Sequence, residues 1–213
     1  MVGPSSTHTA GAVRIGFLAY KILGEIPKEV SILFHGSFAE TYRGHGTDLA
    51  IVSGLLGLKA DDERIRDALD IAKKKNIKIS FRKIDLGNEY HSNTVKIIIK
   101  GKVVPKIEII ASSVGGGNVV IVEINGFSTE LTGNYNTVIT LHKDKPGIVA
   151  SVTGLLSKYG VNIASMNVSR RAKGRDAFMA IEVDGEISKK FLQEISSLEE
   201  IKMVRLLESN SSQ

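Results

Sequence analysis

The chain has 213 residues, of which 42% are hydrophobic and 24% are charged, values that are typical of a globular protein with a substantial core. It contains no cysteine, which excludes disulfides, thiolate zinc sites and any iron–sulfur cluster held by this chain alone. No apolar run approaches the roughly 18 residues that span a bilayer, and no secretory signal pattern begins the chain, so we expect a cytoplasmic protein without membrane contact.

The formal net charge of +5 raises nucleic acid as a partner. However, the basic residues are spread along the chain, with short clusters only at 73–75 and 170–171. Aromatic residues make up 6% and tryptophan is absent, which disfavours a stacking platform for single strands. We therefore interpret the excess charge as a solvated surface and expect no nucleic-acid partner.

The first predicted elements are mainly helical. Residues 10–26 place apolar side chains at helical spacing and predict a helix, and 29–35 predicts a short strand. A glycine-rich segment, YRGHGTD (42–48), then leads into an apolar helical run at 49–57. Residues 61–75 predict a charged helix, because acidic residues suit a helix N-terminus and lysines suit its C-terminus.

The pattern then changes to strands. Runs rich in β-branched residues between turn signals predict strands at 77–85, 94–101, 102–113 and 118–126. Gly133 and Asn134 resemble a joint between domains. We therefore expect an α+β domain over residues 1–133 and a second, smaller domain over residues 134–213.

The second domain has a recognisable order of elements. A strand, a helix, two strands, a helix and a last strand are predicted at 137–142, 148–159, 161–171, 176–184, 187–198 and 201–208. This order is the ferredoxin-like βαββαβ arrangement, so the fold class of the whole chain is predicted to be α+β.

The stretch LHKDKPGIVASVTGLLSKYGVNIASMNVSRR closely resembles an ACT domain, the small regulatory module that binds amino acids. A glycine at a helix start lets the backbone approach a ligand, and the helix N–H groups can hold a carboxylate. Carried over by position, the resemblance implies Asp144, Gly147, Ile148 and Asn162 as ligand contacts. Many ACT domains serve mainly as dimer interfaces, so ligand binding and assembly both stay open. We expect two copies of this chain to pair through these domains.

Four polar or glycine-rich clusters interrupt the first domain, at 5–9, 44–48, 91–94 and 113–117. Each has a plain structural interpretation as a helix cap, a hairpin turn or a flexible linkage. Three of the clusters carry a histidine, and their number within one small domain favours a functional site.

GPSSTHTAG, GSFAETYRGHGTD, HSNT and SVGGGNV, in this order and before an ACT domain, look like the β subunit of bacterial iron–sulfur-dependent L-serine dehydratase. The resemblance covers nearly the entire chain and implies that the first domain has the fold of the allosteric substrate-binding domain of some phosphoglycerate dehydrogenases. That family converts L-serine to pyruvate and ammonia without pyridoxal phosphate. It uses a four-iron four-sulfur cluster, one iron of which lacks a cysteine ligand and acts as a Lewis acid on the serine hydroxyl.

Because this chain has no cysteine, the resemblance implies that the cluster belongs to an α subunit and that no metal ligand comes from this chain. This chain would supply the other wall of the active site. The substrate carboxylate would meet the hydroxyls of Ser5, Ser6 and Thr9 at a helix start, while His8 binds substrate or orients these hydroxyls. The other implied substrate contacts are Thr47, Asn93, Gly115 and Gly116.

A base that works near neutral pH is best supplied by histidine. His45, accessible between two glycines, is the first candidate for removing the α-proton, and His91 is the second candidate for acid or base work. Asp48 either fixes the tautomer of His45 or caps the following helix, and we favour the cap. His35 and His142 are predicted to be structural.

A stand-alone amino-acid sensor built from the same two domains is the alternative function. In such a protein the polar clusters would bind a ligand and catalyse nothing. Accessible histidines beside a cluster of hydroxyls are needed by a lyase and not by a sensor, so the sequence favours the lyase subunit.

Overall fold

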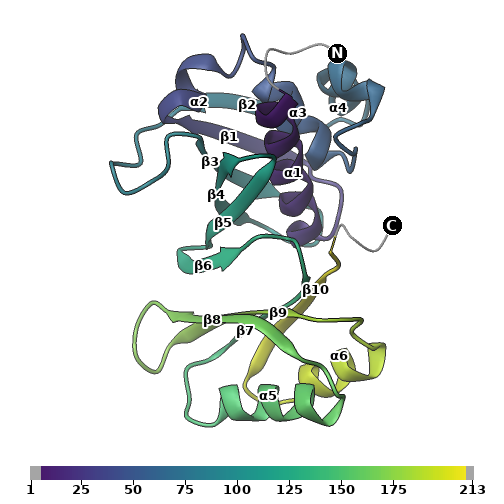
Figure 1. Cartoon of the computed structure of the whole chain (residues 1–213), viewed down its shortest axis with the longest axis vertical. Helices are drawn as coiled ribbons and strands as arrows, with labels where there is room; N and C mark the ends of the chain where they lie inside the picture. Colours follow the sequence, from purple (N-terminus) through teal and green to yellow (C-terminus); the bar gives the residue numbers. More distant parts are fainter. Residues whose placement is uncertain (1–5, 210–213) are drawn as a thin grey trace. The chain divides into compact units, whose positions relative to one another are not determined.

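The computed structural model describes the backbone of residues 6–209 and the side chains of residues 9–209, and it divides the chain into two compact units, Met1–Asn125 and Gly126–Gln213 (Figure 1). The sequence suggests a division after Gly133. The structure divides the chain earlier because β6 (Phe127–Leu131) packs within the second unit, where the Phe127 ring stacks on Phe178 with 5.9 Å between centroids.

The first unit combines four α-helices with a sheet. Its elements in the described residues are α1 (Ser6–Leu23), β1 (Glu29–His35), α2 (Gly36–Thr41), α3 (Thr47–Leu55), the 3₁₀-helix η1 (Glu63–Asp67), α4 (Ala68–Lys74), β2 (Lys78–Lys83), β3 (Thr94–Lys100), β4 (Ile107–Gly115) and β5 (Asn118–Ile124). The strand order within this unit is β2-β1-β3-β4-β5. β2 runs parallel to β1, whereas β1, β3, β4 and β5 pair antiparallel.

Several element boundaries differ from the sequence prediction for local reasons. The first helix ends at Leu23, because Gly24 has a φ of +75°, the left-handed conformation that commonly terminates a helix. The strand predicted from residue 102 begins only at Ile107, and Pro105 just before it has no N–H to donate to a neighbouring strand. The predicted charged helix at 61–75 is divided into η1 and α4. The sequence pattern does not predict α2 or β6.

One face of this sheet carries the core. Every second side chain on β1 and β3 is buried, namely Val30, Ile32 and Phe34 on β1 and Val95, Ile97 and Ile99 on β3. Three helices cover this face: α1 packs on β4 and β5, α3 lies beside α1, and α4 contacts α3 and β2 (Figure 1). The alternation with period two is what a sheet covered on one face requires.

The helices α1 and α3 approach each other so closely that their contact has no room for a side chain. A Cβ at Gly54 would overlap the backbone of α1, and a Cβ at Gly16 would overlap the carbonyl oxygen of Ile51. One turn further along α1, the Tyr20 ring lies against Gly57. The contacts therefore advance in the same direction along both helices, so the N-terminal ends of α1 and α3 lie at the same end of the unit.

The second unit has the predicted ferredoxin-like βαββαβ arrangement. Its elements after β6 are β7 (Asn136–Lys143), α5 (Ile148–Lys158), β8 (Ile163–Arg170), β9 (Asp176–Val183), α6 (Lys189–Ser196) and β10 (Ile201–Leu207). The sheet order is β10-β7-β9-β8, and both helices pack on one face through Val152, Leu156, Phe191 and Ile195. Among residues 6–209, the structure contains no helix with the length and apolar character that crossing a membrane requires.

Gly54→Ala is expected to lower the free energy of unfolding by about 1–3 kcal/mol or more, because the new methyl group forces α1 and α3 apart. Gly154→Ala is the matched control, since a Cβ at this glycine of α5 would meet nothing within 4 Å. The control is expected to stabilise by about 0.4–1 kcal/mol. Urea unfolding followed by circular dichroism measures both, and equal effects would contradict the close helix contact.

Candidate functional site

The polar clusters of the first unit meet at one end of its sheet. β1 ends at His35, which pairs with Thr94 at the start of β3, and Thr94 pairs in turn with Ser112 near the end of β4. The turn after β4 reaches the start of α1, because a Cβ at Gly117 would lie 3.8 Å from the Cβ of Ala10. We call this region the polar end; it comprises residues 6–11, 35–36, 91–94 and 112–117.

The start of α1 rests directly on β4. A Cβ at Gly11 would overlap the hydroxyl of Ser113, so the helix and the strand lie in close contact at this glycine. The backbone N–H of Ser113 donates to the carbonyl of Asn93 at 3.0 Å. Ser113 therefore links the start of α1 to the 91–94 turn. The first N–H groups of a helix have no partner within the helix and attract an anion such as a carboxylate.

Only some of the predicted carboxylate-binding residues are described at this helix start. Ser5 lies outside the described residues, and Ser6 and His8 belong to the first turns of α1, where only their backbone is described. Thr9 is half-buried in the next turn. Gly115 and Gly116 have φ values of +97° and +60°, the left-handed region that favours glycine, and they form the turn that follows β4.

The 91–94 turn is held by its own hydrogen bonds. The backbone N–H of Asn93 donates to Nδ1 of His91 at 3.0 Å, and the Thr94 hydroxyl donates to the His91 carbonyl at 2.6 Å. Because Nδ1 accepts a hydrogen bond, the neutral His91 ring carries its proton on Nε2. In this tautomer the exposed His91 ring offers Nε2–H as a hydrogen-bond donor, and its role in acid or base work stays a prediction.

The side chain of Asn93 has a buried oxygen, Oδ1, that has no hydrogen-bond partner among the described residues. Leaving a buried acceptor without a donor costs about 1–3 kcal/mol, and such groups are uncommon in folded proteins. An N–H donor on a bound ligand, such as an ammonium group, would satisfy this oxygen.

His45 lies just before α3, in the short segment that the GHGTD motif forms. It is half-exposed, and Gly46 after it has a φ of +66° and is the N-cap of α3. Thr47 is buried in the first turn. Because α1 and α3 run in the same direction, this segment lies at the same end of the unit as the start of α1.

Asp48 is not the N-cap of α3, the role that the sequence favoured for it. It lies in the first turn, where its Oδ1 accepts a hydrogen bond from the N–H of Leu49 at 2.9 Å. Burial raises the pKa of the Asp48 carboxyl, and the backbone hydrogen bond and the nearby Arg43 oppose this shift without cancelling it.

The four residues predicted to bind an ACT ligand do not come together within one chain. Asp144, Gly147 and Ile148 lie at the start of α5, whereas Asn162 follows its other end. An α-helix of 11 residues is about 16 Å long.

Two of these four side chains are also engaged elsewhere in the unit. The Asp144 carboxylate accepts a hydrogen bond from the Arg170 guanidinium at 2.8 Å, and Asn162 donates to Asp184 at 2.7 Å. His142, on β7, is 2% exposed beside the hydroxyl of Thr140, and burial lowers its pKa.

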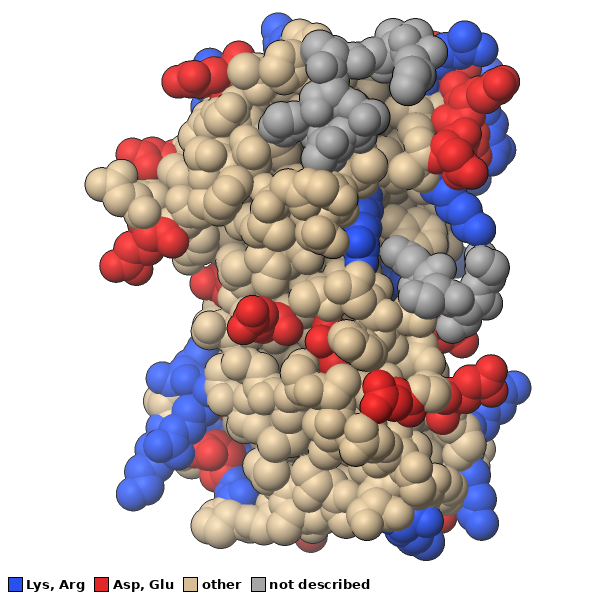
Figure 2. Space-filling view, in the orientation of Figure 1, with Lys and Arg blue, Asp and Glu red and all other residues tan. Residues whose placement is uncertain are grey.

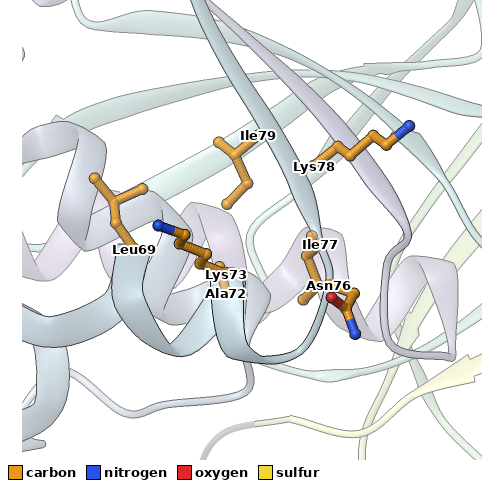
Figure 3. Close-up of a pocket in the computed structure, with 7 residues that line it drawn as sticks. All are labelled: Leu69, Ala72, Lys73, Asn76, Ile77, Lys78 and Ile79. Atoms are coloured by element: carbon orange, nitrogen blue, oxygen red, sulfur yellow. The ribbon is translucent and has the colours of Figure 1, made fainter.

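A pocket of about 410 Å³ lies between α4 and β2 (Figure 3). It is lined by Leu69, Ala72, Lys73, Asn76, Ile77, Lys78 and Ile79. Its wall is mainly apolar, with two lysines as its titratable groups, and it contains no residue of the polar end. We therefore do not assign the candidate site to this pocket.

Two further features concern metals and charge. Among the described side chains, no group of three or more histidines and carboxylates is arranged to hold a metal ion. Figure 2 shows that lysine and arginine side chains on the visible face form separate groups interspersed with aspartate and glutamate.

Comparison with known proteins gives two family matches. The model of the serine dehydratase beta chain matches residues 1–123, and the model of the ACT domain matches residues 136–200. The second match agrees with the βαββαβ arrangement of the second unit.

Individual relatives cover nearly the whole chain. The probable L-serine dehydratase beta chain of Bacillus subtilis (strain 168) is 45% identical over 201 residues, which cover 94% of this chain and 90% of the relative. The L-serine dehydratase beta chain of Peptoniphilus asaccharolyticus is 36% identical over 208 residues, with 98% and 94% coverage. A D-3-phosphoglycerate dehydrogenase of Bacillus subtilis is 27% identical over 92% of this chain but only 37% of its own length.

Asp48→Asn is expected to raise the free energy of unfolding at pH 7. The folded pKa of Asp48 lies above its ordinary value of 3.8, so folding disfavours the charged form. Wild-type stability therefore gains from protonation as the pH falls from the raised pKa towards 3.8, and the advantage of the variant shrinks over that range. Urea unfolding at a series of pH values measures the difference.

Asp62→Asn is the control, for which the opposite change in the free energy of unfolding is expected. Its hydrogen bonds from Arg64 lower the pKa of Asp62 to about 2, so its contribution is present above the unfolded pKa and is lost as the pH falls. This variant is expected to be less stable than wild type at pH 7. A loss of stability in Asp48→Asn at pH 7 would show that the favourable position of the charge at the start of α3 outweighs its burial.

Proposed function

The chain belongs to the family of serine dehydratase beta chains, and from this membership we propose that it forms the substrate-binding half of an L-serine dehydratase. A separate α subunit would provide the other half, and together they would convert L-serine to pyruvate and ammonia. The observation that carries the proposal is the polar end, where the strand register holds together a helix start, a histidine donor and a buried amide oxygen that has no partner among the described residues.

An iron–sulfur cluster does not fit the residues of this chain. Cluster irons are held mainly by cysteine thiolates, and the sequence contains none. In the proposal the four-iron four-sulfur cluster belongs to the α subunit, where it would supply Lewis-acid chemistry to the serine hydroxyl. The roles that follow concern only the residues of this chain.

The start of α1 would bind the carboxylate of L-serine. The N–H groups of a first helical turn have no acceptor within the helix, and together with the positive end of the helix dipole they favour an anion; the hydroxyls of Ser5, Ser6 and Thr9 would add donors. His8 would orient these hydroxyls or contact the substrate. The backbone of Gly115 and Gly116 forms the adjacent turn, and among the described residues a Cβ at Gly115 would meet no atom within 4 Å, which is compatible with a small substrate there.

The 91–94 turn would bind the amino group. Asn93 Oδ1 is an acceptor without a partner among the described residues, and a substrate ammonium is a charged donor. Binding of L-serine would therefore remove the cost of this buried acceptor. A substrate without the amino group would leave the oxygen unsatisfied and is expected to bind more weakly.

The two accessible histidines would have different roles. His45 would remove the proton from Cα, and the carbon–oxygen bond would then break, so that the hydroxyl group leaves as hydroxide, takes up a proton to form water, and aminoacrylate remains. His91 would donate a hydrogen bond from Nε2, because its Nδ1 is already an acceptor. Aminoacrylate tautomerises to the imine, and water hydrolyses this to pyruvate and ammonia. Thr47 is buried beside the His45 segment and would support its position.

We also propose that two copies of the chain pair through their ACT domains, along β8. This strand is an edge of the four-stranded sheet and carries Met166 and Val168, which are 41% and 44% exposed. An edge strand with exposed apolar side chains is a template for pairing with another strand. Two copies of β8 related by a twofold axis would pair antiparallel.

Anaerobic co-expression with the α subunit, followed by a pyruvate assay on L-serine, tests the catalytic proposal. His45→Ala is expected to lower kcat by about 10²–10⁴-fold, the usual contribution of a general base, while the complex stays assembled. Wild-type activity in this variant would remove His45 as the base. A wild-type complex that has its cluster intact, binds L-serine and forms no pyruvate would favour the amino-acid sensor.

Val168→Asp is expected to convert paired chains into monomers, because it buries a charge at the centre of the β8 contact. Light scattering coupled to size-exclusion chromatography measures the mass. Val103→Asp makes the same change at a valine of the first unit that is 82% exposed, and it should leave the mass unchanged. Equal masses for wild type and Val168→Asp would exclude β8 as the pairing strand.

A further inference from the structure

The segment between β2 and β3, residues 84–93, brings His91 and Asn93 to the polar end. Most of its residues are exposed, and Leu86 is one of the few that are half-buried. An exposed segment loses considerable conformational entropy when it is held in one position. Contacts with a rigid element are therefore needed to fix the two functional side chains.

The end of β1 provides such contacts. The N–H of Ile84 donates to the carbonyl of Phe34 at 2.9 Å, and the N–H of Leu86 donates to Nδ1 of His35 at 3.1 Å. His35 is 9% exposed, so its ring is itself held by packing. The Asp85 carboxylate lies 3.8 Å from the same nitrogen, but it is 91% exposed and beyond hydrogen-bond distance. The backbone hydrogen bond from Leu86 therefore determines the orientation of the His35 ring.

The other end of the segment meets the residues that follow His35. Gly36 has a φ of +56°, and a Cβ there would lie 2.5 Å from the carbonyl oxygen of Ser92. The N–H of Phe38 donates a hydrogen bond to the same oxygen, at 3.4 Å. Residues 34–38 thus contact this segment near both of its ends, and the side chain of His35 contacts it at Leu86.

We propose that His35 is a positioning residue for the 84–93 segment: by accepting the Leu86 N–H it holds His91 and Asn93 at the polar end. The catalytic consequence of this inference rests on the proposed function, whereas the hydrogen bond itself does not. Because Nδ1 accepts the hydrogen bond, the neutral ring carries its proton on Nε2. A hydrocarbon ring of similar size has no acceptor at this position and therefore cannot replace His35.

Two variants separate the acceptor from the ring. His35→Phe keeps an aromatic side chain and removes the acceptor, whereas His35→Asn keeps an acceptor, Oδ1, close to the position of Nδ1. Amide hydrogen exchange of the full chain is measured at Leu86 for wild type and both variants. Exchange at Leu86 is expected to accelerate at least about tenfold in His35→Phe, as loss of roughly 1.4 kcal/mol would give, and to stay near wild type in His35→Asn.

Kinetics of the complex with the α subunit give the second readout. In His35→Phe, kcat/KM for L-serine is expected to fall about 10–100-fold, because small displacements of positioned groups have effects of this size, and His35→Asn is expected to recover most of the loss. Wild-type exchange at Leu86 in His35→Phe, or equal exchange in both variants, would overturn the inference. Faster exchange with unchanged kcat/KM would overturn the positioning role. An inactive wild-type complex would overturn the proposed function and leave the exchange measurement to decide the hydrogen bond.

Discussion

The close contact between α1 and α3 is the constraint on which the first unit depends. Gly16 and Gly54 let the two helix backbones meet, and no side chain fits between them. This contact fixes the direction of α3 relative to α1, and so brings the GHGTD segment to the end of the unit where α1 begins. Gly11 repeats the device against Ser113 of β4 and places the helix start on the sheet. At Gly16 and Gly54, glycine serves close packing and not chain flexibility.

The antiparallel register of the sheet provides the rest of the polar end. His35, Thr94 and Ser112 come from three neighbouring strands and align in one row, because the register pairs His35 with Thr94 and Thr94 with Ser112. The row explains why clusters far apart in the sequence share one location. In the proposal, this region forms one wall of the active site, and a partner is needed because the chain has no cysteine with which to hold the cluster on the other.

Much of the fold was predictable because its signals are local. β1 occupies the predicted residues 29–35, and the βαββαβ order of the second unit follows from alternating apolar runs between turns. β6 was not predictable, since its short run FSTEL gains its burial from Phe178 and other residues distant in the chain. The sequence motifs include the residues of the polar end, but they do not indicate the tautomer of His91 or that Asn93 Oδ1 lacks a partner among the described residues, because both depend on side-chain positions. The grouping of Asn162 with Gly147 fails within one chain because α5 separates them.

The central claim is that the start of α1, the 91–94 turn and the 115–117 turn form one site for L-serine. Hydrogen exchange of the complex with its α subunit, with and without L-serine, measures this most directly. We predict that L-serine slows exchange in all three segments, and that the slowing depends on L-serine concentration in the same way in each. Slower exchange confined to residues 144–148, or no change at the polar end while pyruvate is being formed, would contradict the claim.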